Sequence, residues 1–131
     1  MENYLPGRCN IGKGEIRKRF GLGLAGFVIA LAIVYAIYLF GLTRLALLAS
    51  FVFLILGFEG FYQGYFRFCA GFAAMGIYDF TGSGGSRQNV TDPSAHLEDM
   101  KKAKKIHIYS IVSSAVIVAI IYFVLLYKGP M

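Results

Sequence analysis

The chain is poor in charge for its length. Of its 131 residues only 15% are charged, whereas 57% are hydrophobic. An ordinary soluble domain has about a quarter of its residues charged and no more than about half apolar. The scarcity of charge therefore argues against a typical soluble domain and favours a single domain embedded in a membrane.

Cysteine and tryptophan are also scarce, with two cysteines and no tryptophan. Two cysteines cannot build the disulfide framework of a small secreted domain. Trp and Tyr normally gather at the two membrane interfaces, so here tyrosine must fill that place alone. The tyrosines that fall mostly near the ends of the apolar segments are Tyr4, Tyr35, Tyr38, Tyr62, Tyr65, Tyr109, Tyr122 and Tyr127.

No catalytic unit is recognisable in the sequence. No serine, histidine and acid form a familiar triad, and neither glycine-rich segment, 12–15 or 82–86, has the arrangement of lysine and hydroxyl residues that a phosphate loop needs. The segment 89–91 matches a glycosylation acceptor, which a cytoplasmic placement would leave unused. We expect no enzyme activity, no catalytic residue, no cofactor and no nucleic-acid partner, while a bound lipid is compatible with such a chain.

Three apolar segments indicate an all-α integral membrane protein with three transmembrane helices. Phe20–Phe40 carries no charge and is long enough to cross a bilayer, which takes about 20 apolar residues. After a tight connection at 41–44, the segment from Leu45 to about Tyr62 returns as the second arm of an antiparallel hairpin, and Ile106–Tyr127 forms the third span. Because polar or mixed residues precede the first span, we expect no cleaved signal peptide.

The segments between the spans allow more than one interpretation. Residues 66–80 are apolar but short for a crossing, so they either continue the second span or lie at the interface, with a complete fourth span as the competing interpretation. Asp92 and Pro93 suit the start of a helix that runs to Tyr127, about 50 Å long, whose first part must protrude. We thus expect a basic segment 1–19, a hairpin 20–80, a flexible linker 81–92 and a long helix 93–131.

The distribution of lysine and arginine predicts the orientation. With three spans, eleven of the 13 basic residues fall on the side of the N-terminus, leaving Arg44 and Lys128 on the other. This bias places the N-terminus in the cytoplasm and the C-terminus outside the cytoplasmic (inner) membrane. The residues on the cytoplasmic side are Arg8, Lys13, Arg17, Lys18, Arg19, Arg67, Arg87, Lys101, Lys102, Lys104 and Lys105.

Two motifs flank the predicted hairpin. The first consists of Asn10, Ile11, Gly12, Glu15, Arg19 and Gly23. The second consists of Phe68, Cys69, Gly76 and Ile77. In residue type and spacing, the two motifs together resemble the opening and the ending of the YgaP-like inner-membrane domain family. The resemblance covers roughly residues 9–79, with Ile16 where an Arg is usual, Ala70 in place of a Pro, and a third span that has no counterpart.

The resemblance implies a two-helix hairpin, often dimeric, in proteins of mostly unknown function. Some of these proteins carry a fused rhodanese sulfurtransferase domain, which we do not expect in this chain. Cys9 and Cys69 both fall near the predicted cytoplasmic face, where reduced thiols are expected. If the two thiols face each other, they could carry sulfur, bind a soft metal or form a redox-sensitive disulfide. The simpler interpretation is that Cys69 is a small packed residue and that the Cys9 thiol has no function.

Glu59 is the best polar candidate within a span, because an acid there usually faces a partner, a cavity or an ion path. Glu59, Gln63 and Arg67 are four residues apart, so Arg67 is an expected ionic partner if the helix continues. His107 could ligate a haem or chlorophyll metal, but a lone histidine beside lysines is more often a headgroup neighbour. His96 lies eleven positions from His107, too far along a helix for a shared metal.

The primary hypothesis is a small non-catalytic membrane protein that acts by association. It would be an accessory or scaffold subunit of a larger membrane complex, or a homo-oligomer. Small residues four apart, such as Gly26 and Ala30, together with Gly57, Gly60 and Gly64, would let another helix approach closely. The alternative is a thiol-dependent carrier of sulfur or soft metal through Cys9 and Cys69, and a weaker third hypothesis is a proton or ion path through Glu59.

Overall fold

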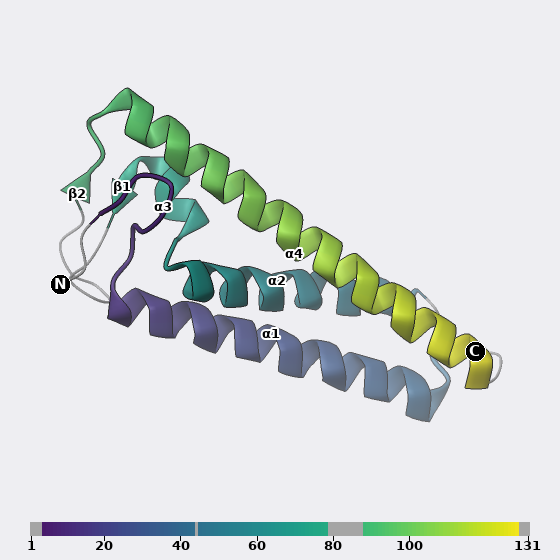
Figure 1. Ribbon diagram of the computed structural model, residues 1–131. Helices are drawn as coiled ribbons and strands as arrows, with labels where there is room; N and C mark the ends of the chain where they lie inside the picture. The colour runs from purple at the N-terminus through teal and green to yellow at the C-terminus, as the bar shows by residue number, and fades with distance from the viewer. Residues whose placement is uncertain (1–3, 44, 79–87, 129–131) are drawn as a thin grey trace.

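Three long helices dominate the computed structural model of the chain, which describes residues 4–43, 45–78 and 88–128 (Figure 1). They are α1 (Lys13–Phe40), α2 (Ala46–Phe66) and α4 (Pro93–Lys128). Each is long and apolar enough to cross a membrane. The three predicted spans are therefore confirmed as helices of suitable length and composition.

Glycines bring α1 and α2 into backbone contact along the hairpin. A Cβ atom on Gly60 would lie 2.5 Å from the backbone nitrogen of Gly23, and one on Gly26 would lie 2.7 Å from that of Gly57. Glycine is needed because any side chain would push the helices apart. The small-residue faces were predicted to let another helix approach. They pack against each other within the hairpin, so they no longer argue for a separate partner.

The polypeptide turns sharply at the end of α2. Arg67 adopts a left-handed conformation with φ 56°, and its N–H bonds the carbonyl oxygens of Gln63 and Gly64. A separate helix, α3 (Ala70–Met75), follows, and the Cys69 thiol at its start accepts the Phe72 N–H at 3.4 Å. Residues 67–78 therefore do not continue α2, and the six helical residues of α3 are far too few for a fourth crossing.

A short antiparallel pair of strands departs from the all-α expectation. β1 (Ile77–Tyr78) pairs with β2 (Gln88–Asn89), with Ile77 opposite Asn89 and Tyr78 opposite Gln88. The pair brings the chain back to the start of α4 after residues 79–87, which hold most of the predicted linker and lie outside the described residues. Two residues per strand are too few to leave an alternating pattern in the sequence.

The long helix α4 begins as predicted, because the Asp92 carboxylate accepts the Ser94 N–H at 3.0 Å. On this helix the Glu98 carboxylate lies 3.5 Å from the Lys101 ammonium, three residues further along. The Lys102 ammonium instead sits 4.0 Å from the ring centre of Phe66. This cation–π contact turns Lys102 toward α2 and away from Glu98.

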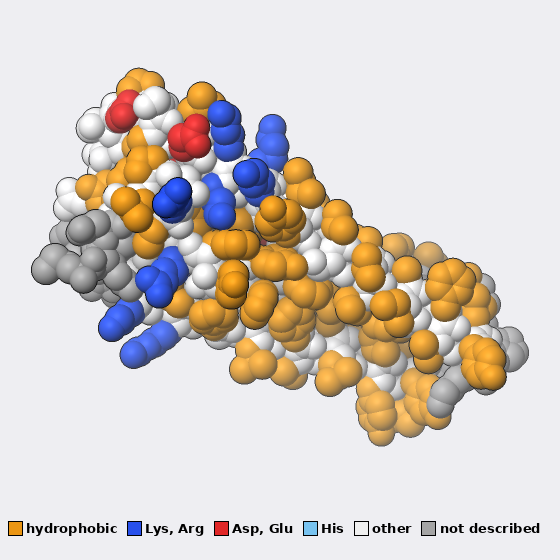
Figure 2. All heavy atoms as spheres, in the orientation of Figure 1, with side chains coloured by type: hydrophobic (Ala, Val, Ile, Leu, Met, Phe, Trp, Pro, Cys, Tyr) orange, Lys and Arg blue, Asp and Glu red, His pale blue; other side chains and the backbone are white. Residues whose placement is uncertain are grey.

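The N-terminal ends of α1 and α4 lie at the same end of the molecule as α3 and the strand pair (Figure 1). We call this end the basic head and define it as residues 4–12, 67–78 and 88–105. Lys and Arg side chains gather there, while hydrophobic side chains cover most of the remaining surface in the view of Figure 2. Arg44 and Arg87, which enter the predicted charge count, lie outside the described residues, as does the side chain of Lys128.

Candidate functional site

A buried asparagine joins the N-terminal segment to the turn after α2. The Asn10 side chain is fully buried; its Oδ1 accepts the Cys69 N–H at 2.7 Å and its Nδ2 donates to the Cys69 carbonyl at 3.1 Å. The Asn10 backbone N–H also donates to the Arg67 carbonyl at 3.2 Å. Asn10 therefore fixes the chain entering α1 against the chain leaving α2.

The same turn receives Arg19 from the second turn of α1. An Nη2–Sγ distance of 2.9 Å joins Arg19 to Cys69, and an Nη2–Oε2 distance of 3.4 Å joins Arg19 to Glu15. The guanidinium also lies 5.7 Å from the ring centre of Phe72. Only 2% of the Glu15 side chain is exposed, and burying a carboxylate is costly unless a cation accompanies it. Arg19 thus neutralises Glu15 and contacts both ends of the α3 N-terminal turn.

Two of the glycines in the predicted motifs, Gly12 and Gly76, complete this arrangement. Gly12 is the last residue before α1, and Gly76 ends α3 with φ 69°, a conformation that glycine adopts at little cost. The next residue, Ile77, packs on a cluster formed by Ile11, Cys69 and Phe72. The six positions Asn10, Gly12, Glu15, Arg19, Cys69 and Gly76 therefore belong to one small unit of the structure, in which Asn10, Glu15 and Arg19 support the turn at Cys69.

The two cysteines have different surroundings: Cys9 is partly buried and Cys69 is buried. Cys9 donates to the Ile11 carbonyl at 3.7 Å. Cys69 is only 4% exposed, and its thiol is engaged by Arg19 and by the N–H of Phe72. These contacts give the Cys69 thiol a structural part in starting α3, so any carrier chemistry at this sulfur requires local opening.

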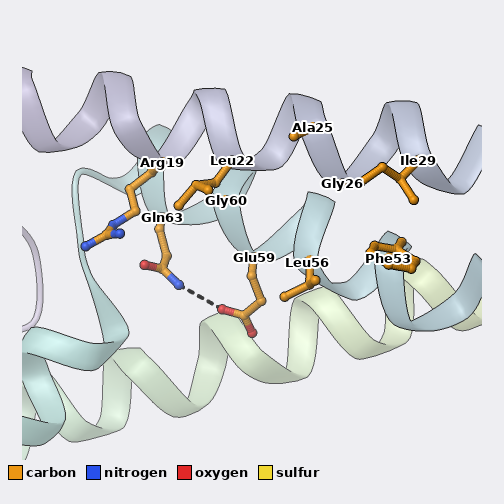
Figure 3. Close-up of a pocket in the computed structure, with 10 residues that line it drawn as sticks. All are labelled: Arg19, Leu22, Ala25, Gly26, Ile29, Phe53, Leu56, Glu59, Gly60 and Gln63. Atoms are coloured by element: carbon orange, nitrogen blue, oxygen red, sulfur yellow. Dashed lines mark hydrogen bonds between the residues drawn. The ribbon is translucent and has the colours of Figure 1, made fainter.

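A groove of about 350 Å³ runs between α1 and α2 (Figure 3). Figure 3 shows its polar side chains, Arg19, Gln63 and Glu59, together at one end. The rest of the lining is apolar or small, and it includes Leu22, Ala25, Gly26, Ile29, Phe53 and Leu56. The gap exists because the small residues that let the backbones meet leave one flank of the hairpin unfilled.

Glu59 links α2 to α4 at the polar end of this groove. Its Oε1 lies 2.5 Å from His107 Nδ1, and its Oε2 accepts from Gln63 Nε2 at 2.9 Å. The expected partner Arg67 does not pair with it, because the left-handed turn at Arg67 removes that residue from the helical face of Glu59. Glu59 and His107 are 48 positions apart in the sequence, and the packing of α4 on α2 brings them into contact.

Among residues 4–43, 45–78 and 88–128, no group of three or more Cys, His, Asp or Glu side chains is arranged to hold a metal ion. His96 lies beside Gly76, where an added Cβ atom would be 3.5 Å from the ring Nδ1 atom. His107 pairs with Glu59 in a different part of the fold. Within the described chain the two histidines therefore serve separate contacts.

Comparison with family models, curated proteins and solved structures finds no significant match for this chain. The resemblance to the YgaP-like domain stays a prediction.

Proposed function

We propose that this chain is a non-catalytic membrane protein that acts by association, as an accessory or scaffold subunit. The partner would be another membrane protein, which binds the outer face of α4 in the basic head. The observation that carries this proposal is the exposure of Leu97 and Met100, which are 55% and 41% exposed.

Lipid does not explain the exposure of these two residues. The apolar side chains exposed after Ile106 can face the hydrocarbon, whereas Leu97 and Met100 lie in the charged part of α4, beside Glu98 and Lys101. They are three residues apart and so share one face of the helix. Exposed apolar residues bordered by charges are typical of protein-binding surfaces, and Met adapts well to a partner.

The opposite face of α4 is occupied within the chain. Asp99, Ala103, Ile106 and Ser110 are buried against the rest of the molecule. Because α4 is held by this inner face, its outer face has a fixed direction. A partner could therefore bind Leu97 and Met100 without unfolding the head.

A paired substitution tests the proposal in native membranes. We expect Leu97→Ser with Met100→Ser to release a stoichiometric partner on mild detergent extraction, while the helical content stays unchanged. The matched control is Leu5→Ser, which removes another head residue that is 50% exposed but lies outside α4. Retention of the partner by the double variant, or a wild-type protein that extracts as a partner-free monomer, would contradict the proposal.

Crosslinking from position 97 identifies the kind of partner. A photoreactive side chain there that captures a different membrane protein supports the accessory role. Capture of a second copy of this chain supports the homo-oligomer in its place. Both outcomes keep association as the function and differ only in its partner.

We also infer that the basic head faces the cytoplasm and that the C-terminus lies outside the inner membrane. The gathering of Arg8 and Lys101–Lys105 in the head supports this orientation, since short cytoplasmic segments are rich in Lys and Arg. Membrane-impermeant labelling of a single cysteine at Leu5 or at Met131 tests it. If the cysteine at position 5 were labelled from outside the cell, the orientation would be the opposite of the one inferred.

A further inference from the structure

A second hollow of about 400 Å³ lies in the basic head, between the N-terminal segment and α4. We call it the basic groove. Its N-terminal wall includes Gly7 and Arg8, and its other wall includes Lys101, Lys104, Lys105 and Ile108 of α4. Nothing in the linear sequence places Arg8 beside this lysine cluster, so the groove is a product of the fold.

The two walls are fastened to one another by a buried carboxylate. Asp99 is fully buried and accepts the Tyr4 hydroxyl at 2.6 Å and the Gly7 N–H at 2.8 Å. These bonds hold the segment 4–8 on α4. The basic groove is therefore preformed and does not depend on a ligand to bring its walls together.

The charge of the basic groove is poorly compensated. Glu98 is the one acid among the described residues that line it, and this carboxylate already lies 3.5 Å from Lys101. Within the described part of the chain, no ion pair joins Arg8, Lys104 or Lys105 to an acid. Lysines at i, i+3 and i+4 on one helix repel each other. An anion bound in the groove would relieve this repulsion.

The position of the basic groove along α4 indicates which kind of anion is present at the same membrane depth. Ile108, which lines the groove, belongs to the apolar stretch that begins at Ile106. The groove thus spans the point where α4 passes from charged to apolar residues, which is the depth of lipid headgroups. Phosphates of anionic lipids are concentrated at that depth and attract Lys and Arg close to the membrane.

We propose that the basic groove binds the headgroup of an anionic glycerophospholipid. The lipid phosphate lies between Arg8 and the ammonium groups of Lys104 and Lys105, and the first part of an acyl chain follows Ile108 into the membrane. Because Arg8 comes from a different segment from the lysines, binding also reinforces the attachment of the N-terminal segment to α4.

The chain contains its own control for unspecific attraction to anionic membranes. Lys13 and Arg17 are exposed at the start of α1, near the same end of the molecule, but they do not line the basic groove. Replacing Lys13 and Arg17 by Gln removes the same charge as replacing Arg8 and Lys105 by Gln. A built site responds to the second pair only, whereas diffuse attraction responds to both.

The experiment measures lipid bound to the full chain in nanodiscs of phosphatidylcholine that contain phosphatidylglycerol, read by native mass spectrometry. Arg8→Gln with Lys105→Gln should weaken phosphatidylglycerol binding about tenfold or more. Lys13→Gln with Arg17→Gln should change it less than about threefold. Thermal unfolding of both variants in phosphatidylcholine alone verifies that the head remains folded.

Three results would overturn the proposal. An equal loss in both double variants would mean diffuse attraction, and equal binding of phosphatidylcholine and phosphatidylglycerol would mean that the lipid charge is not recognised. Full displacement of the lipid by soluble glycerol phosphate would assign the groove to a free phosphate ester. The residues tested differ from Leu97 and Met100, so the partner proposal and the lipid proposal can fail separately.

Discussion

Asn10 bonds both the N–H and the carbonyl of Cys69, a residue 59 positions further along the chain. One amide thus closes the hairpin at its open end, opposite the connection between α1 and α2. The tie positions the segment that carries Tyr4 and Arg8 next to α4. The basic groove therefore depends on a polar contact at the far side of the head.

Replacing Asn10 by Ala should destabilise the head strongly. The change leaves the N–H and the carbonyl of Cys69 without their partners in a buried place, which costs roughly 2–4 kcal/mol of unfolding free energy. Denaturant unfolding in detergent micelles measures the loss. Asn89→Ala is the matched control, because the Asn89 side chain is exposed in β2 and its removal should cost less than about 0.5 kcal/mol. Similar values for the two variants would contradict this role of Asn10.

Gly60→Ala should separate α1 from α2. The added methyl group would lie 2.5 Å from the Arg19 carbonyl oxygen and the Gly23 nitrogen, which are backbone atoms that cannot turn away. Overpacking of this kind costs roughly 1–3 kcal/mol. The control Gly21→Ala has no atom within 4 Å of the new methyl, and higher helix propensity should make it neutral or stabilising by up to about 1 kcal/mol. Unfolding of both variants checks the opposite signs.

Tyr4→Phe should lower the stability of the head at neutral pH and reduce its sensitivity to alkali. Burial and the bond to Asp99 raise the pKa of Tyr4 well above its ordinary value of about 10. The resulting stabilisation is complete below about pH 10 and is lost as the pH rises above that value toward the folded-state pKa. Phe keeps the ring stacked on Tyr78, at a centroid distance of 4.5 Å, without the ionisable hydroxyl. If the unfolding free energies of variant and wild type changed equally with pH between about pH 9 and 11, this role of Tyr4 would be refuted.

Glu59 and His107 should be energetically coupled. We expect a double-mutant cycle of Glu59→Gln and His107→Ala to give a coupling of roughly 0.5–1 kcal/mol, modest because the His107 side chain is 54% exposed. A coupling of zero would show that the contact does not help to hold α4 on α2. The single variant Glu59→Gln also tests the ion-path hypothesis, which requires a change in proton or ion flux across proteoliposomes.

Serine substitutions separate the structural part of Cys69 from thiol chemistry. A Ser hydroxyl can still accept the N–H at the start of α3 and a hydrogen bond from Arg19, so Cys69→Ser should lose less than about 1.5 kcal/mol of unfolding free energy. Cys69→Ala removes both contacts and should lose more. The double variant Cys9→Ser with Cys69→Ser addresses the carrier hypothesis. Loss of persulfide or soft-metal binding in a folded double variant would favour the carrier, and unchanged binding would exclude it.

The sequence determined the three long helices, because uninterrupted apolar runs of membrane-spanning length permit little else in a bilayer. It also located the start of α4 at Asp92 and Pro93 and indicated a close approach of helices through Gly26 and Gly57. These features depend on neighbouring residues or on composition. They can therefore be recognised without knowing how the chain folds back.

The tertiary structure decided which partners these features receive. The glycine faces of α1 and α2 pack against each other, and Glu59 pairs with His107 and not with Arg67. Arg8 lines the same groove as Lys104 and Lys105. The reason is that the left-handed turn at Arg67 and the Asn10–Cys69 bonds bring together segments from distant parts of the chain. Such contacts leave no period in the sequence, because each depends on a single residue meeting another one far away.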